Sequence, residues 1–252
     1  MARGAMHRMI EIGAEGDQNH RRNLTDHRFG CPPCYTFPMV AWEPRPDCAK
    51  CPRLARFRRD NQAAYLDFHN APVAAFGSLD APLLIVGLAP GLKGANRTGR
   101  PFTGDFAGDL LYGTLLEFGL ARGNYDRRAD DGFYLCGCRV TNAIRCVPPA
   151  NKPTPDEAKN CRPYLTAEIG AMPSLKGIIG LGQIAHTAVV AAYALRQKDL
   201  PFGHGRIHDL GDGRFLADSY HCSRYNTNTG RLTPKMFREV VAAAMARARI
   251  AG

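Results

Sequence analysis

One stretch constrains the fold of this sequence more than any other: the uninterrupted apolar run LLIVGL, from Leu83 to Leu88, which leads directly into a loop rich in glycine. Such a run is typical of a parallel β-strand buried on both faces, because a strand with one wet face would alternate apolar and polar residues. Similar short runs recur at residues 139–144, 177–181 and 215–220, with helix-like segments between them. The pattern predicts an α/β fold in which helices flank a parallel sheet.

The segments between these runs carry the start and stop signals of helices. The expected helices cover residues 107–118, begin at residue 155, begin near residue 183, and run from residue 234 to about residue 250. The second of them has Thr154 as its N-cap and Glu157 placed to complete a capping box. Pro163 should kink this helix or end it early, because proline cannot donate the backbone hydrogen bond of a helix interior.

Length and hydropathy limit the class of protein. A chain of 252 residues can form one sizeable α/β domain with decoration. We expect a flexible basic arm over residues 1–30, which lack periodicity, and a single domain with a cluster-binding segment over residues 31–252. The sequence contains no apolar run long enough to span a membrane, and its N-terminus lacks the apolar core of a secretion signal, so we expect a cytoplasmic monomer.

Charge points to a class of partner. The sequence has 33 lysines and arginines against 23 acidic residues, a net charge of +10. Six of the basic residues and one acid fall between residues 221 and 252, and the glycine-rich loop adds Lys93, Arg97 and Arg100. Clustered cations of this kind favour binding to a phosphodiester backbone. The alternative is a solvated cationic face that aids solubility.

The cysteines suggest a metal centre. Nine cysteines are more than core packing requires, and an odd number cannot all form disulfides. Two Cys-x2-Cys pairs have the spacing of a four-cysteine zinc ribbon, namely Cys31, Cys34, Cys48 and Cys51. Cys146 and Cys161, however, lie in segments rich in proline, asparagine and charge, where a core cysteine is not expected. The residues alone leave both ligand sets open.

Three loops should share one rim of the sheet, because ligands of open α/β folds bind beyond the carboxyl ends of the strands. The first, residues 89–105, is dense in glycine but matches neither common nucleotide-binding pattern. Within it Phe102 could stack on a flat ligand or simply cap the core. Asp105, at the end of the loop, could act in catalysis or only cap the next helix.

The other two rim loops, residues 142–151 and 221–233, each begin with a polar side chain at a strand end. The Asn142 amide can both donate to and accept from a ligand, although an asparagine there could also close its own turn. His221 would usually be structural if it stood alone. Polar groups at several strand ends of one rim favour a shared site.

Together, four motifs resemble those of the uracil-DNA glycosylase superfamily, most closely family 5, type B. They are GLAPGLKGANRTGRPFTGD at residues 87–105, TNAIRC at 141–146, DCAKCPRL at 47–54 and YHCSRYNTNTGRLT at 220–233. The resemblance spans about residues 45–245. It implies a three-layer α/β/α sandwich around a four-stranded parallel sheet, an iron–sulfur cluster, and base flipping followed by hydrolysis of the N-glycosidic bond of uracil or another deaminated base in DNA.

The resemblance also assigns roles to residues. It implies a [4Fe–4S] cluster held by Cys48, Cys51, Cys146 and Cys161. The implied catalytic residues are Asp105, His221 and Asn142, with Asp109 as a weaker candidate for the acid. The implied base pocket consists of Gly87, Ala89, Gly91, Phe102, Asn142 and His221. The DNA contacts are expected from Arg97, Arg100, Ser223, Arg224, Tyr225, Asn226 and Arg231, with Arg224 and Tyr225 as candidates for the wedge that fills the gap left by the base.

Two departures from the family pattern keep other functions open. The last motif commonly reads His-Pro-Ser, whereas here Cys222 stands in place of the proline, and Lys93 stands where relatives often have histidine. A lysine near the sugar could form a Schiff base if its pKa were lowered. The alternatives are therefore a protein of the same fold that binds or covalently traps damaged DNA, and a non-catalytic zinc-ribbon module that binds nucleic acid.

Overall fold

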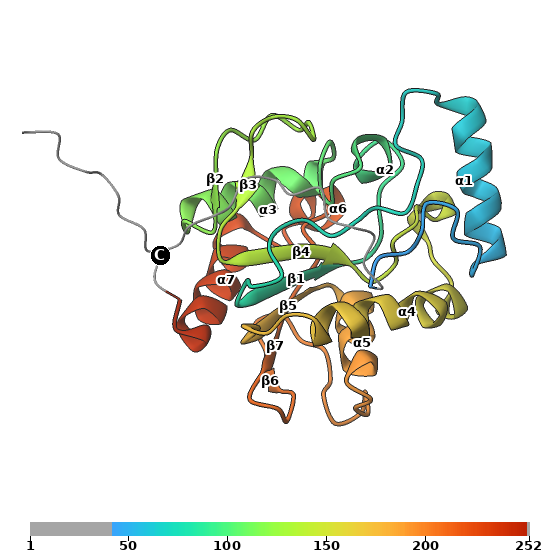
Figure 1. Ribbon diagram of the computed structural model, residues 1–252. Helices are drawn as coiled ribbons and strands as arrows, with labels where there is room; N and C mark the ends of the chain where they lie inside the picture. The colour runs from blue at the N-terminus through green and yellow to red at the C-terminus, as the bar shows by residue number, and fades with distance from the viewer. Residues whose placement is uncertain (1–41, 251–252) are drawn as a thin grey trace, which may run out of the picture. The chain divides into compact units, whose positions relative to one another are not determined.

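A five-stranded sheet forms the centre of the computed structural model, which describes residues 42–250 (Figure 1). The strands are β1 (Leu83–Gly87), β4 (Cys138–Asn142), β5 (Gly177–Leu181), β6 (Ile207–Asp209) and β7 (Phe215–Ser219), in the order β4-β1-β5-β7-β6. The four predicted strands are all present and pair in parallel. The expectations for residues 1–30 and for Cys31 and Cys34 lie outside the described residues.

The fifth strand corrects the predicted four-stranded sheet. β6 pairs antiparallel with β7 at one edge, so the sheet is mixed. It is only three residues long and mostly exposed, and it therefore lacks the apolar run that identified the others. A tight connection through Gly211 and Gly213, both with positive φ, folds it back onto β7.

Seven helices and one small hairpin complete the described part of the chain. The helices are α1 (Pro52–Ala64), α2 (Ala95–Thr98), α3 (Phe106–Glu117), α4 (Pro155–Gly170), α5 (Gln183–Ala192), α6 (Arg224–Asn228) and α7 (Pro234–Ala248). A 3-10 turn covers Pro149–Asn151, and the hairpin pairs β2 (Ala121–Arg122) with β3 (Tyr134–Leu135). The four predicted helices correspond to α3, α4, α5 and α7, whereas α1, α2 and α6 were not predicted.

Helix α4 confirms one local prediction and overturns another. The capping box is present, since Thr154 accepts a hydrogen bond from the Glu157 amide and the Glu157 carboxylate accepts one from the Thr154 amide at 2.8 Å. The prediction that Pro163 ends the helix early is wrong, because α4 continues to Gly170, whereas the alternative of a kink stays a prediction. Leu165 and Ile169, beyond the proline, are buried in the core, and their burial offsets the one hydrogen bond that proline cannot make.

Alternating strand residues face two separate apolar cores, as a three-layer α/β/α sandwich requires. Leu83 and Ile85 of β1 pack with α3 and α7, whereas Leu84 and Val86 pack with α4 and α5. Figure 1 shows α4 and α5 below the sheet and α3 above it. Each strand is buried on both faces, which is why the strands could be recognised as continuous apolar runs.

The strand order places a crevice at one end of the sheet. The chain passes from β1 to α3 on one face and from β5 to α5 on the other. The loops that leave these two neighbouring strands therefore diverge, which opens a space beyond their carboxyl ends. In the residues that the structure describes, no helix is both long and apolar enough to cross a membrane.

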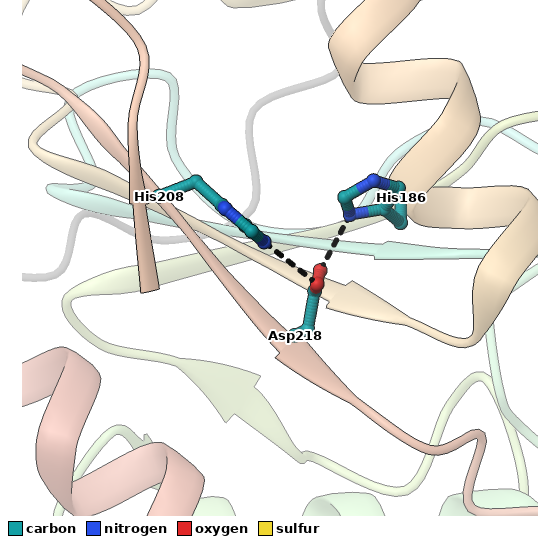
Figure 2. Close-up of side chains that lie close together, drawn as sticks. All are labelled: His186, His208 and Asp218. Atoms are coloured by element: carbon teal, nitrogen blue, oxygen red, sulfur yellow. Dashed lines mark hydrogen bonds and ion pairs between the residues drawn. The ribbon is translucent and has the colours of Figure 1, made fainter. Parts of the chain in front are cut away.

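A buried polar cluster ties α5 to the last two strands (Figure 2). Asp218 of β7 lies 2.8 Å from Nδ1 of His186 and 3.1 Å from Nε2 of His208, and it also accepts a hydrogen bond from the Gly203 amide. The second ring nitrogen of His186 lies 2.8 Å from the Leu200 carbonyl oxygen. These hydrogen bonds account for the facing polar atoms of the three side chains, and we assign the cluster a structural role.

The Asp218→Ala variant is expected to lose about 3 kcal/mol of unfolding free energy, because it leaves the fully buried His186 and the partly buried His208 and Gly203 amide without this acceptor. Urea denaturation measures this loss. Asp218→Asn is the matched control. Its amide oxygen can accept from some of these donors, and its NH2 group can donate to a ring nitrogen that carries no proton. The loss of unfolding free energy in Asp218→Asn should therefore be less than half of that in Asp218→Ala. Equal losses in the two variants would contradict the structural role assigned to these hydrogen bonds.

Candidate active site and cysteine centre

A cleft of about 1070 Å³ opens at the carboxyl ends of β1, β5 and β7. It occupies the crevice that the strand order creates. The predicted site residues that line it are Ala89, Gly91, Asp105, His221, Ser223, Arg224, Asn226 and Arg231. All three predicted rim loops reach this hollow, the second of them through Asn151, although its residues lie up to about 140 positions apart in sequence.

Asp105 both caps α3 and lines the cleft. Its Oδ1 accepts hydrogen bonds from the amides of Ala107 at 3.1 Å and Gly108 at 3.3 Å. Its Oδ2 faces the glycine-rich loop so closely that a Cβ on Gly94 would lie 2.4 Å away. Burial raises the pKa of Asp105 and outweighs the opposing effect of the two amides. Asp105 can therefore cap α3 with one carboxylate oxygen and still act in catalysis with the other.

Asp109, the weaker candidate for the acid, lies at the same cleft but is already paired. Both of its carboxylate oxygens accept hydrogen bonds from Arg127 at 2.8 Å. The pair is partly exposed to solvent. This arrangement favours Asp105, whose second oxygen faces the cleft-lining loop rather than a cation.

Phe102 lies behind the cleft wall rather than on it. Its side chain is 6% exposed and belongs to the core on the α3 face. Its ring stacks on that of His221, with centroids 5.9 Å apart and an interplanar angle of 28°. Its φ of +52° places it in the left-handed region, which residues with a Cβ seldom adopt. Phe102 thus both caps the core and supports a residue of the cleft.

Gly87 and Asn142 pair with one another at the ends of β1 and β4. A Cβ on Gly87 would lie 2.4 Å from Cζ of Phe102 and 2.5 Å from Oδ1 of Asn142, so only glycine leaves room for both side chains. The Asn142 side chain is buried, yet among residues 42–250 it makes no hydrogen bond. An amide that does not close its own turn is available to a ligand.

His221 begins the third rim loop and lines the cleft. Its carbonyl oxygen accepts a hydrogen bond from the Asn226 side chain at 2.8 Å, which fixes the start of the loop. Burial lowers the pKa of His221 to about 4. At neutral pH the ring is therefore uncharged and can still donate one N–H to a ligand.

Several residues predicted to contact DNA surround the mouth of the cleft. Arg224 lies over the Phe106 ring at 5.3 Å and Arg231 over the Tyr220 ring at 4.6 Å, so both guanidinium groups are held in place while remaining exposed. Tyr225 is 71% exposed, and Arg97 is exposed too. Ser223 instead caps α6, although it also lines the cleft.

The predicted DNA contact of Arg100 is wrong. Its side chain is 5% exposed, and both terminal nitrogens donate to the Asp131 carboxylate at 2.8 Å. A guanidinium already paired inside the protein cannot reach a phosphate. The basic character of its loop in the sequence did not reveal this burial.

The four cysteines predicted as cluster ligands come together. Cys48, Cys51, Cys146 and Cys161 all line one small hollow between α1, the loop after β4, and α4. Two donors point at their sulfurs, Arg58 at 3.7 Å from Cys146 and the Arg145 amide at 3.4 Å from Cys161, and the Tyr164 hydroxyl lies 3.8 Å from the Cys48 sulfur. Burial raises the pKa of Cys146 to about 12 and also raises that of Cys161. Four such thiolates need a bound cation to be stable.

The donor set suits either zinc or an iron–sulfur cluster. Sulfurs around one tetrahedral zinc, with bonds of about 2.3 Å, would lie about 3.8 Å apart. In the described part of the chain, His186, His208 and Asp218 form a group of three ligand atoms within 4.8 Å of one another, and the cysteines form no such group. The four cysteines are therefore candidate ligands that line one hollow, and none of these distances assigns the group they hold.

Sequence reasoning missed several residues of the cleft. Gly182, Phe202 and Tyr220 line its β5 and β7 side, and Arg127 lines its mouth. Gly182 has a φ of +91° and approaches His221, so its place directly after a predicted strand was a usable signal. Phe202 and Arg127 come from long connections without periodicity, and no sequence signal marked them.

Comparisons with known proteins agree with this geometry. Residues 74–244 match the family model described as the uracil DNA glycosylase superfamily. The chain is 44% identical over 199 residues to the type-5 uracil-DNA glycosylase of Thermus thermophilus, covering 77% of this chain and 90% of that protein. It is 37% identical over 204 residues to the type-5 enzyme of Pyrobaculum aerophilum, covering 79% of this chain and 88% of that protein.

Proposed function

Since this chain belongs to the uracil-DNA glycosylase superfamily, we propose that its cleft receives a base everted from DNA and that its rim residues cleave the bond to the sugar. The activity is that of a uracil-DNA glycosylase, a hydrolase that acts on N-glycosyl bonds in DNA repair. The observation that carries the residue assignments is the convergence of Asp105 and His221 on one hollow, backed by Phe102 and Asn142. A base inside a duplex is out of reach of such a hollow, which makes base flipping necessary.

Recognition of the base falls to the end of the cleft nearest β1 and β4. The Asn142 amide, which makes no side-chain hydrogen bond within residues 42–250, can donate to one group of a pyrimidine edge and accept from another. Gly87 leaves room beside this amide for the Phe102 ring, which supports the region from behind the cleft wall. Ala89 and Gly91 line the cleft without bulky or charged groups, and therefore leave space for a flat base.

Bond breaking creates opposite charges that different residues stabilise. The base leaves with its electron pair, and the neutral His221 ring donates a hydrogen bond to the base oxygen where negative charge grows; such a donor is worth about 3 kcal/mol. The sugar becomes an oxocarbenium-like cation. The ionised Asp105 carboxylate stabilises that cation and takes a proton from the water that attacks it, which leaves an abasic site.

The DNA backbone is bound by the exposed cations at the mouth of the cleft. Arg97, Arg224 and Arg231 neutralise phosphates, so affinity should fall steeply with salt. Ser223 and Asn226 hold the loop that presents Arg224 and Arg231. The exposed Tyr225 ring serves as the wedge that replaces the everted base, with Arg224 beside it.

The cysteine centre holds a [4Fe–4S] cluster in a structural role. Cys48 and Cys51 precede β1 in the sequence, whereas Cys146 and Cys161 follow β4. The cluster therefore fixes α1 and α4 against the core. When bound, the cluster would cross-link these segments of the chain, and it would supply no redox chemistry to the reaction. We further propose that the protein acts as a monomer in the cytoplasm on nucleoid DNA.

The decisive experiment incubates the protein with a duplex that carries one uracil and then treats it with alkali, which cuts the strand at an abasic site. Strand cleavage together with free uracil supports a monofunctional glycosylase. Intact DNA and no released base would refute the activity, and a stable complex without turnover would favour a trapping protein. Borohydride trapping of a covalent adduct, lost in Lys93→Arg, would instead indicate Schiff-base chemistry.

The Asn142→Ala variant is expected to lower the preference for uracil over other bases by about 10- to 100-fold, since specificity that rests on a buried hydrogen-bond pair is lost with that pair. Release rates from oligonucleotides with a single uracil, hypoxanthine, xanthine or ethenocytosine measure the preference. Asn124→Ala is the control, because Asn124 is exposed and does not line the cleft. Unchanged selectivity would show that the pocket reads shape alone.

A further inference from the structure

Arg100 lies at the centre of a buried cage of aromatic rings. Its guanidinium carbon is 5.2 Å from the ring centre of Phe76, 5.4 Å from that of Phe133 and within 6 Å of those of Tyr112 and Tyr125. Its charge is balanced by Asp131, whose side chain is 1% exposed. Arg100 is the residue two positions before Phe102, in the loop that carries the base pocket.

Asp131 anchors this ion pair to the connection between β2 and β3. Besides Arg100, it accepts hydrogen bonds from the backbone amides of Asp126 at 2.9 Å and Phe133 at 3.1 Å. Although burial acts to raise the pKa of Asp131, these hydrogen bonds outweigh it and hold the pKa well below its usual range. The carboxylate is therefore ionised at neutral pH and pairs there with Arg100.

Side chains of the cage hold the backbone on both sides of Phe102 through hydrogen bonds. Nε of Arg100 donates to the Thr103 hydroxyl at 2.7 Å, and that hydroxyl donates to the Pro101 carbonyl at 3.1 Å. The Tyr112 hydroxyl also donates to the Pro101 carbonyl, and the Tyr125 hydroxyl donates to the Phe102 carbonyl at 3.1 Å. The carbonyls before and at Phe102 are thus both held by residues of the cage.

These hydrogen bonds maintain an unfavourable backbone conformation at Phe102. Phe102 has a φ of +52°, in a region where a side chain with a Cβ is strained by about 1 to 2 kcal/mol. Such a conformation persists only where the surroundings over-determine it. In that conformation the Phe102 ring reaches His221, at 5.9 Å, and lies beside Gly87 and Asn142.

We propose that Arg100 and Asp131 are positioning residues of the glycosylase: the buried pair holds the strained Phe102 so that its ring sets the places of His221 and the pocket floor. The proposal rests on the proposed roles of Phe102 and His221. It assigns Arg100 a function inside the protein instead of a contact with DNA. Loss of the pair lets Phe102 relax and misplaces the groups that stabilise the leaving base.

The test measures single-turnover uracil release with enzyme in excess, since that rate does not depend on the fraction of active protein. Arg100→Met is expected to slow release by about 100-fold, the effect of misplacing reacting groups by about 1 Å. Its DNA affinity and the salt dependence of that affinity should not change. The exposed pair of Arg128 and Asp130 supplies the control, and Arg128→Met should release uracil at the rate of the unaltered enzyme.

A double variant shows whether Arg100 acts through Phe102. If it does, Arg100→Met combined with Phe102→Leu is no slower than the slower single variant; multiplied effects would overturn the proposal. A salt slope reduced by about one in Arg100→Met would also overturn it, because it would indicate a phosphate contact. If Phe102→Leu alone releases uracil at the rate of the unaltered enzyme, the proposed role of Phe102 is wrong as well. Should Arg100→Met not fold, Asp131→Asn gives the same readouts with the side-chain shape retained.

Discussion

Replacing Asp105 with asparagine is expected to slow uracil release by about 10³-fold, within the range that a positioned acid or base contributes. The substitution removes the charge that faces the sugar cation and the group that takes the proton from water. Asparagine can still accept from the amides of Ala107 and Gly108, so α3 keeps its cap. Single-turnover assays measure the rate, and a binding assay on the same duplex should show nearly unchanged affinity.

The stability of this variant gives a second readout. Because burial raises the pKa of Asp105, its ionised form opposes folding at neutral pH, and that cost disappears as pH falls through the pKa. Asp105→Asn should therefore be at least as stable as the unaltered protein at neutral pH. Asp105→Ala, in contrast, should lose about 1 kcal/mol with the cap. Equal losses of rate and DNA affinity in the asparagine variant would remove Asp105 from the catalytic residues.

The pH dependence of the rate separates Asp105 from His221. Asp105 must be deprotonated to act, so the acid limb of the profile should lie above the range of an ordinary aspartate. That limb should vanish from the residual activity of Asp105→Asn. In the folded protein His221 takes up a proton only near pH 4, whereas an unburied histidine does so near pH 6.5, so its contribution makes stability fall as the pH drops from about 6.5 to about 4. A profile identical in both proteins would contradict the role of Asp105.

Replacing Cys161 with serine is expected to abolish the bound cluster and to destabilise the fold strongly. Cys161 is buried on α4 and faces the hollow that the other three cysteines share. Because a metal centre seldom forms in the unfolded chain, its binding free energy adds to the free energy of unfolding. Iron and sulfide content, brown colour and thermal unfolding of the variant measure the loss.

A double variant, Cys31→Ser with Cys34→Ser, is the control for this experiment. It should retain iron, because Cys48, Cys51, Cys146 and Cys161, which line the hollow, are a complete set of four ligands without them. Loss of metal in the double variant together with retention in Cys161→Ser would instead support the zinc ribbon of Cys31, Cys34, Cys48 and Cys51. Zinc in place of iron in the unaltered protein would contradict the cluster assignment.

Features encoded by neighbouring residues were predictable. The apolar runs that became β1, β4, β5 and β7 could be recognised because burial on both faces leaves no polar positions. The cap of α4 was visible for a similar reason, since a capping side chain acts within three residues of itself. The rim location of Asp105 and His221 followed from the rule that ligands bind beyond parallel strands.

Features that depend on distant partners were not predictable. Helix α1 has few apolar residues, and two of its buried side chains are the polar Arg58 and Asn61. The edge strand β6 exists only because β7 offers it a partner. Arg100 looked like a surface cation until Asp131, some thirty residues later, and a cage of aromatic rings enclosed it.

The amino-acid sequence by itself determined the α/β class, the four parallel strands, the rim that carries the chemistry and, through its motifs, the glycosylase family. The tertiary structure alone decided which polar side chains are exposed and which are buried: Asp109 is paired with Arg127, Arg100 lies in the core, and Phe102 stands behind His221. The reason is physical. Periodicity and capping reflect interactions within a few residues, whereas burial and ion pairing depend on partners that only the folded chain brings together.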